Sequence, residues 1–209
     1  MWSGGLGFRR ACRGEWFNLR RRLLDRLTQD MSKGLVDPDI AEFLARINKE
    51  WWIVTSSSCS GRIVVLAARE PWDKESGRIV ARSHSPIDQA WLADALREAE
   101  YTGLPCVWVS AQPPVLTLYV CGEENALRVV DAAIDAGFKY ACYRPSRRAR
   151  NAYYVIIKGS ERIDVPVKLW GRQIALVDVI TLTNVLNKYL ERGKERLEKL
   201  KTKLLELVS

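Results

Sequence analysis

Residues 51–67 read WWIVTSSSCSGRIVVLA. Two apolar, β-branched runs, Trp51–Thr55 and Ile63–Ala67, flank a polar stretch and are typical of strands. No helix separates them, and strands follow one another again later in the chain. Further strands are expected at 78–82, 106–110, 116–121, 139–143, 153–158 and 162–167, and helices at 15–33, 87–100, 123–136, 182–208 and from Asp37-Pro38 onward. This order predicts an α+β protein with a mixed β-sheet packed with α-helices and a long C-terminal helix.

The composition is that of a globular protein. The chain has 209 residues, of which 47% are hydrophobic and 28% charged, and no shift in composition marks a domain boundary. A chain of this length can bury one substantial core or at most two small ones, and we expect a single domain. Lys and Arg number 33 against 25 for Asp and Glu, which gives a net charge of +8. This excess indicates an anionic partner such as nucleic acid, an acidic membrane surface or a phosphorylated ligand, although a soluble basic protein without such a partner has the same balance.

Targeting signals and cysteine motifs do not stand out. The longest apolar runs are strand-sized, well below the roughly 18 residues of a spanning helix, and the N-terminal arginines precede no apolar segment. We expect a cytoplasmic protein without a membrane segment. The five cysteines are widely spaced without a C-x-x-C, and there is one histidine. We therefore expect neither a disulfide framework nor a zinc ribbon, and no bound metal.

The polar stretch 55–62, TSSSCSGR, is the first candidate site. Its hydroxyl groups, its backbone N–H groups and the Arg62 guanidinium suit a phosphate, a carboxylate or ribose hydroxyls. The alternative is a polar hairpin whose serines bond to their own backbone. Length and serine content favour a functional loop, since hairpin turns use Asn, Asp, Gly or Pro over about two to five residues. A thiol nucleophile at Cys59, with His84 as its base, is a further alternative.

Two other regions have functional chemistry. His84 follows an expected strand and precedes an expected helix, and histidine is the residue type that suits proton transfer near neutral pH, although a structural histidine fits this position as well. The segment 139–154 interleaves cationic residues with four tyrosines. Cationic side chains neutralise phosphates, and tyrosine rings stack on unpaired bases. We interpret this segment as an RNA-binding surface rather than as a solvated loop beside core tyrosines.

Motifs of several enzyme classes do not occur in the chain. There is no G-x-G-x-x-G after the first strand, no Walker loop, no G-x-S-x-G and no H-x-E paired with C-x-x-C. From the residues alone, the chain is a basic α+β protein that binds RNA or another polyanion and has a serine-rich candidate site.

The most specific segment of the chain is Ser57–Ile63, SSCSGRI. Other short segments accompany it in chain order: Asp30–Gly34 with Asp37, Ile47-Asn48, Thr55, Ser83-His84, Ala136–Lys139 and Val165-Pro166. Together they resemble the wybutosine-synthesising protein 3 family, the tRNA methyltransferases of the wyosine pathway. The resemblance runs from about Phe17 to the last helix and implies one methyltransferase domain at 17–209, preceded by an N-terminal extension at 1–16.

The resemblance implies a non-Rossmann fold and transfer of a methyl group from S-adenosylmethionine. The acceptor is N-4 of the demethylated tricyclic guanosine derivative, 3′ to the anticodon of tRNA-Phe. The expected catalytic residues are His84, Ser58 and Cys59, with His84 orienting the acceptor or taking its proton. Residues expected to bind the cofactor or the base are Ser57, Ser60, Gly61, Arg62, Asp30 and Lys33, and those expected to bind the anticodon loop are Lys139, Tyr143, Arg144, Arg147, Arg148 and Arg150. The alternative is a non-enzymatic RNA-binding protein, which needs the basic surface but no methyl donor.

Overall fold

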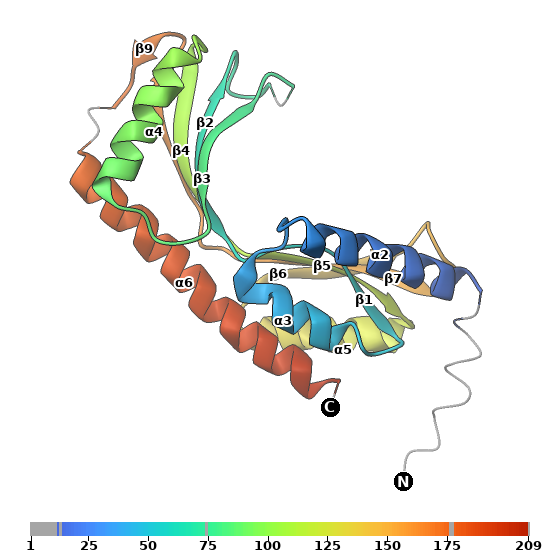
Figure 1. The fold of residues 1–209 in the computed structure, drawn as a ribbon. Coiled ribbons are helices and arrows are strands. Elements are labelled where there is room, and N and C mark those ends of the chain that lie inside the picture. The colour runs from blue at the N-terminus through green and yellow to red at the C-terminus, as the bar shows by residue number, and fades with distance from the viewer. Residues whose placement is uncertain (1–11, 13, 74, 176–177, 209) are drawn as a thin grey trace. The chain divides into compact units, whose positions relative to one another are not determined.

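A computed structural model describes residues 12, 14–73, 75–175 and 178–208. These residues form two compact units. Unit 1 comprises the chain up to Ser60, Pro114–Ser160 and the chain from Arg196 onward. Unit 2 comprises Gly61–Pro113 and Glu161–Glu195. Each unit contains one antiparallel sheet with helices packed on it, which confirms the α+β class (Figure 1).

Unit 1 contains a four-stranded sheet of order β1-β5-β7-β6. Its strands are β1 (Ile53–Cys59), β5 (Val115–Cys121), β6 (Tyr140–Pro145) and β7 (Ala152–Lys158). Helices α2 (Glu15–Ser32) and α3 (Pro38–Ile47) pack against β1, and α5 (Glu123–Asp135) packs against β5, β6 and β7. The helix expected after Asp37 is confirmed, with Pro38 as its first residue. Proline is tolerated there because the N–H of a first helical residue has no partner within the helix, so its absence costs no hydrogen bond.

The core of unit 1 joins the helices to the sheet. Trp16 and Leu19 of α2, Ile47 of α3 and Leu118 of β5 are almost completely buried. Complete burial of a side chain such as Leu or Ile contributes about 1.5–3 kcal/mol. The Trp16 indole N–H donates to the carbonyl oxygen of Trp51 at 2.8 Å, so the polar atom of this buried ring is also paired.

Unit 2 contains a five-stranded sheet of order β3-β2-β4-β8-β9. Its strands are β2 (Arg62–Ala68), β3 (Arg78–Ser83), β4 (Cys106–Gln112), β8 (Ile163–Leu169) and β9 (Arg172–Gln173). Helix α4 (Gln89–Tyr101) and the first part of α6 (Val179–Glu206) pack on the same side of this sheet (Figure 1). Leu92 of α4 and Leu186 of α6 meet Ile63, Val65 and Val109 of the strands in its core.

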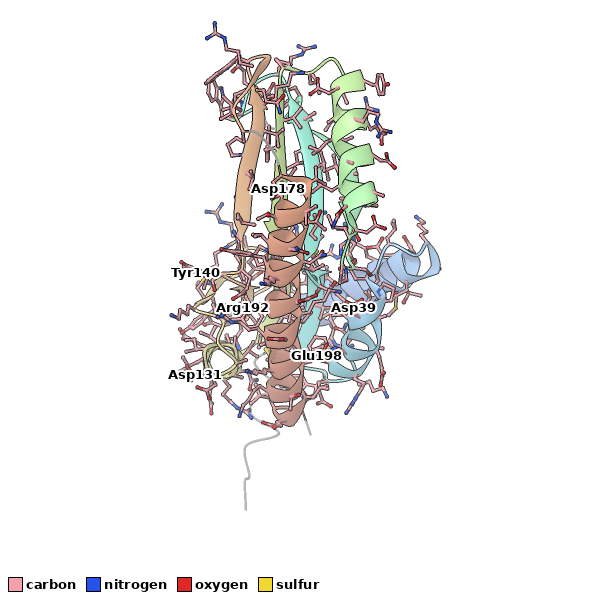
Figure 2. The ribbon with its side chains drawn as sticks, turned by 90° about the vertical axis from the view of Figure 1, so that its left-hand side faces the viewer. Asp39, Asp131, Tyr140, Asp178, Arg192 and Glu198 are labelled. Atoms are coloured by element: carbon pink, nitrogen blue, oxygen red, sulfur yellow. A yellow bond between two sulfur atoms is a disulfide. The ribbon has the colours of Figure 1, made fainter. Side chains whose placement is uncertain are left out.

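Helix α6 is the predicted long C-terminal helix, and it contributes to both cores. Leu186 and Leu190 belong to the core of unit 2, whereas Leu197, Leu200 and Leu204 belong to that of unit 1. Charged residues such as Arg192 and Glu198 lie on its exposed face (Figure 2). The leucine seam and the charged face together give the amphipathic pattern predicted from the sequence. Among the described helices, none combines the length and the apolar content that crossing a bilayer requires.

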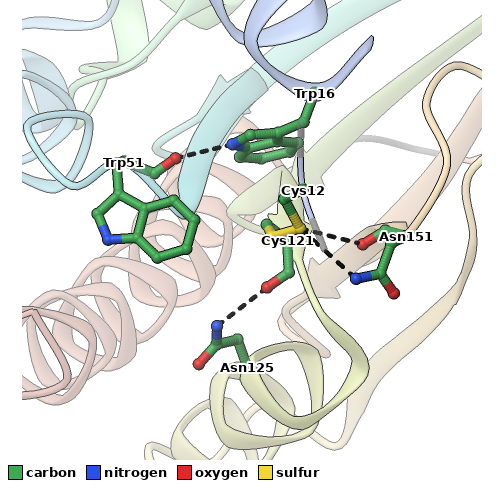
Figure 3. The surroundings of a disulfide bond; sticks show 6 residues. All are labelled: Cys12, Trp16, Trp51, Cys121, Asn125 and Asn151. Atoms are coloured by element: carbon green, nitrogen blue, oxygen red, sulfur yellow. Dashed lines mark hydrogen bonds between the residues drawn. A yellow bond between two sulfur atoms is a disulfide. The ribbon is translucent and has the colours of Figure 1, made fainter. Parts of the chain in front are cut away.

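A disulfide between Cys12 and Cys121 corrects the expectation drawn from cysteine spacing (Figure 3). The two residues are 109 positions apart in sequence, but their Cα atoms are 6.1 Å apart, a distance that a disulfide spans. Cys121 ends β5, and its carbonyl oxygen accepts a hydrogen bond from Asn125 Nδ2 at 2.9 Å. The two cysteines come together only in the folded chain. A search for closely spaced cysteine motifs therefore does not identify this pair.

The strands differ from the prediction in two further respects. Every pairing between the described strands is antiparallel, so two antiparallel sheets replace the expected mixed sheet. The serine stretch is also not a loop. Strand β1 continues through it to Cys59, because Ser57–Cys59 pair with β5.

Candidate active site

The serine stretch forms the second half of β1 and contains a β-bulge at Ser56. Thr55 pairs with Leu118 of β5 and Ser57 pairs with Thr117, so Ser56 is an extra residue on β1. Residues opposite each other across a ladder share a face of the sheet. The bulge therefore places Thr55 and Ser58 on one face and Ser57 on the other. Strict alternation without the extra residue would put Thr55 and Ser58 on opposite faces.

Two buried side chains hold β1 on either side of this bulge. Asn48, which follows α3, donates from Nδ2 to Thr55 Oγ1 at 2.7 Å and accepts the Thr55 N–H at 2.9 Å. Thr117 Oγ1 accepts the Ser57 N–H at 3.0 Å and donates to the Ser57 carbonyl oxygen at 2.8 Å. These bonds satisfy backbone groups at the point where the bulge interrupts the ladder.

Asp37 holds the end of the same strand. It occupies the N-cap position of α3, but its side chain makes no capping bond to that helix. Instead, its Oδ2 accepts the Ser60 N–H at 2.7 Å. The predicted N-cap position of Asp37 is thus confirmed, while its carboxylate binds the backbone just beyond the end of β1.

The hydroxyl groups of Ser58 and Ser60 are buried, and within the described part of the chain neither has a hydrogen-bond partner. An unpaired buried polar group costs about 1–3 kcal/mol. Native structures leave few such groups, and those that remain call for a water, an ion or a ligand. Ser58 is therefore a ligand-binding candidate on structural grounds as well as by resemblance.

A pocket of about 140 Å³ lies within unit 1, beside the serine stretch. Its lining brings together Asp30, Ser57 and Ser58, three of the residues expected from the sequence. Arg26 Nε lies 3.6 Å from Asp30 Oδ2, so the wall combines an ion pair with hydroxyl groups. Lys33, beyond the end of α2, is exposed and lies outside this lining. The described residues that line the pocket are Leu23, Arg26, Leu27, Asp30, Leu35, Val36, Leu44 and Thr55–Ser58.

Three predicted residues of unit 2 are held by bonds within that unit. His84 Nδ1 lies 3.0 Å from the carbonyl oxygen of Gly61. Because a carbonyl only accepts, Nδ1 carries a hydrogen in this bond, which fixes the orientation of the ring. Gly61 has φ of 94°, a conformation that favours glycine. Arg62 Nε donates to Gln112 Oε1 at 2.8 Å, which fixes the direction of its guanidinium.

Two arginines of the predicted RNA-binding segment cover tyrosine rings on one face of the unit 1 sheet. The guanidinium carbon of Arg144 is 5.1 Å from the centre of the Tyr154 ring, and that of Arg148 is 5.8 Å from the centre of the Tyr119 ring. The two ring centres are 4.9 Å apart. This Arg144–Tyr154–Tyr119–Arg148 cluster combines cations with aromatic faces, as nucleic-acid surfaces do.

Tyr143 lies on the opposite face of the sheet, because neighbouring residues of a strand alternate. Its ring packs edge-on against Tyr153, and its hydroxyl donates to Glu123 Oε1 of α5 at 3.2 Å. This hydrogen bond to a carboxylate raises the pKa of Tyr143. The remaining cations of the predicted surface, Lys139, Arg147 and Arg150, are exposed.

Sequence reasoning missed Thr117 and Arg26. Thr117 is one β-branched residue within an apolar strand, and no spacing links it to the serines 60 positions earlier. Arg26 is one of several arginines on α2, and only the pocket distinguishes it from the others. Asn48 belongs to a segment that carried the family resemblance, but its bonds to Thr55 appear only in the structure.

Comparison with known proteins gives consistent relatives. Residues 18–206 match the family described as methyltransferase TYW3. A Saccharolobus solfataricus protein named tRNA(Phe) 7-((3-amino-3-carboxypropyl)-4-demethylwyosine(37)-N(4))-methyltransferase is 32% identical over 190 residues, which cover 89% of this chain and 88% of the relative. A Pyrococcus horikoshii protein with the same name and the suffix 2 is 33% identical over 183 residues, covering 87% and 86%.

Solved structures show the same fold. A Pyrococcus horikoshii protein superimposes with a TM-score of 0.80 at 25% identity, covering 91% of this chain and 96% of that chain. A hypothetical protein from Aeropyrum pernix superimposes with a TM-score of 0.68 at 29% identity, covering 82% and 99%. The likeness therefore extends over both units and not over one motif alone.

Proposed function

This chain belongs to the TYW3 methyltransferase family, and from that premise we propose that it methylates N-4 of the demethylated tricyclic guanosine derivative at position 37 of tRNA(Phe). The observation that carries the proposal is the family match over residues 18–206. It is joined by the activity named for relatives that align with this chain over 88% and 86% of their own length. We propose further that residues 17–209 act as one methyltransferase domain and that the protein acts in the cytoplasm on its tRNA. Of the extension expected at 1–16, residues 1–11 and 13 lie outside the described residues, and Trp16 of α2 belongs to the core of unit 1.

S-adenosylmethionine is the proposed donor, and it supplies a methyl group activated on a sulfonium. The pocket of about 140 Å³ is smaller than the roughly 300–1,000 Å³ of complete ligand sites, so it fits part of such a molecule. The buried Ser58 hydroxyl supports binding here, because a ligand atom would complete its hydrogen bonding. Arg26 and Asp30 offer opposite charges that match the carboxylate and ammonium of an amino-acid group.

The residues of the chain contribute binding, orientation and exclusion of water. Leu23, Leu27 and Leu44 in the pocket wall restrict solvent beside the serines. This favours methyl transfer from a sulfonium, a step that depends on positioning and desolvation. For His84, the proposed role is to orient the acceptor or to take its proton, and the bond from Nδ1 to Gly61, which holds the ring in place, supports it. Arg62, Gly61 and Ser60 keep their proposed role in holding the base or the donor.

The anticodon loop is the proposed partner of the Arg144–Tyr154–Tyr119–Arg148 cluster. Guanidinium groups neutralise phosphates, and the partly exposed Tyr154 ring offers an aromatic surface beside Arg144. The Tyr119 ring is 6% exposed and supports Arg148 rather than a base. Exposed Lys139, Arg147 and Arg150 add positive charge to the same segment. Tyr143, bonded to Glu123 on the other face, is assigned to packing against α5.

A transfer assay tests the proposed function. The protein is mixed with radiolabelled S-adenosylmethionine and with tRNA-Phe that carries the demethylated tricyclic base, and unmodified tRNA-Phe is the control. Label in the modified tRNA alone is the expected result. No label in either tRNA, together with no donor binding by calorimetry, would contradict the proposal and favour a non-enzymatic RNA-binding protein.

A further inference from the structure

Thr117 is a side chain that the proposed function does not use, although it makes two hydrogen bonds to the candidate site. It is 7% exposed and lies directly opposite Ser57 across the β1–β5 ladder. Its hydroxyl accepts the N–H and donates to the carbonyl of the same residue, which a hydroxyl can do because it is both donor and acceptor. Together the two bonds fix the peptide planes on both sides of Ser57.

The position of these bonds matters because Ser57 lies between the bulged Ser56 and the pocket residue Ser58. A shift of one residue in register moves every following side chain to the other face of a sheet. Loss of the bulge would therefore turn Ser58 away from the face that it shares with Thr55. In the bulged register the Thr117 hydroxyl satisfies the N–H and the carbonyl of Ser57 at the interruption of the ladder.

We propose that Thr117 is a positioning residue for methyl transfer, which holds the β1 bulge and thereby sets the direction of the Ser58 hydroxyl. Thr117 lies outside the pocket lining, so it acts through the Ser57 backbone and not on a ligand. This inference rests on the proposed function, because Ser58 matters to catalysis only if its pocket binds donor or acceptor. Methyl transfer depends strongly on such positioning, because a misplacement of about 1 Å costs on the order of 10²-fold in rate.

The test compares Thr117→Val with Thr117→Ser. Valine keeps the branched shape without the hydroxyl, and serine keeps the hydroxyl. For Thr117→Val we expect kcat/KM for the donor to fall about 10- to 100-fold, with KM for the tRNA unchanged. Thr117→Ser should retain kcat/KM within about threefold, because it can make both bonds. Thr183→Val is the matched control, since the Thr183 hydroxyl is also buried but has no partner in the described part of the chain.

Hydrogen–deuterium exchange of the segment 53–60 gives a readout that does not depend on activity. The Ser57 amide should exchange faster in Thr117→Val than in the wild type, in Thr117→Ser and in Thr183→Val. A folded Thr117→Val protein with wild-type kcat/KM would overturn the proposal, as would a Thr117→Ser protein as impaired as the valine variant. An inactive wild type would refute the proposed function, and unchanged Ser57 exchange in Thr117→Val would then refute the positioning role separately. If Thr117→Val does not fold, the wild type alone gives the test: rapid exchange of its Ser57 amide would overturn the positioning role, because an amide held by Thr117 should exchange slowly.

Discussion

Unit 1 and unit 2 share one plan, an antiparallel sheet with helices on it, but they fix their polar groups in different ways. In unit 1 the serines lie inside strand β1, which Asn48 holds at Thr55 and Thr117 holds at Ser57, 60 positions away from it in sequence. In unit 2, Gly61 and His84 lie at the ends of the paired strands β2 and β3 and bond to each other. Polar groups at strand ends thus find partners across a hairpin, whereas those inside a strand need partners from elsewhere in the fold.

The largest effect is expected at His84, which lies at a strand end of unit 2 and has a proposed role as acid or base. His84→Ala should lower kcat by about 10²- to 10⁴-fold, the usual contribution of a general acid or base, with the thermal unfolding temperature unchanged. His84→Asn distinguishes the roles of the two ring nitrogens. The asparagine amide can still donate to the Gly61 carbonyl as Nδ1 does, but it has no atom in the place of Nε2. Full activity in His84→Asn would reduce the histidine to a structural role, and both variants are measured in the transfer assay.

The second effect concerns the stability of unit 1, where the disulfide closes a loop of 109 positions. Cys12→Ser should lower the free energy of unfolding by about 2–4 kcal/mol, since a crosslink restricts the unfolded chain. Exchange of amides in β5 and β4 checks whether the loss is confined to unit 1. Cys142→Ser, at an exposed cysteine of β6, is the control. Equal stability of Cys12→Ser and the oxidised wild type would contradict this prediction.

A smaller effect is expected on tRNA binding at the tyrosine face of unit 1. Replacing both Arg144 and Arg148 by Ala should weaken binding and reduce the slope of log K against log salt by about 1.5, because two phosphate contacts are lost. Arg128→Ala, at an exposed position of α5, is the matched control and should leave the slope unchanged. A filter-binding titration at several salt concentrations measures both. An unchanged slope in the double variant would remove this cluster from the RNA interface.

The smallest effect is expected at Cys59, the alternative nucleophile of unit 1. If methyl transfer proceeds without a thiolate, Cys59→Ser should retain turnover within about threefold, whereas loss of a nucleophile would cost about 10³-fold or more. The transfer assay and a circular dichroism melt decide between the two. A folded but inactive serine variant would return Cys59 to the reaction.

Most elements were predicted because their cause is local. Helical spacing of apolar residues identified α2, α3, α4, α5 and α6, and β-branched runs identified the longer strands. The exceptions have physical reasons. Strand β9 has two residues, too few for a pattern. The serines of β1 were expected to form a loop because polar residues rarely continue a strand, and only pairing with β5 keeps them extended.

The candidate site was predicted in part. The composition of the stretch 55–62 indicated Ser57 and Ser58, the resemblance added Asp30, and the pocket brings the three together. Neither composition nor resemblance supplied Arg26 or Thr117 as site residues, because their relevance depends on the packing of α2 and on the register of β5. Tyr143 and Arg144 were expected to act together, but strand alternation separates them onto opposite faces.

The sequence by itself determined the class of fold, the basic charge and the family, because these follow from periodicity, composition and a short run of specific residues. Only the tertiary structure decided which cysteines meet, which face each tyrosine takes and how the serines are held. Each of these depends on contacts between segments far apart in the chain, such as Cys12 with Cys121 and Ser57 with Thr117. Local patterns do not encode such contacts, because they are set by the register and packing of complete sheets.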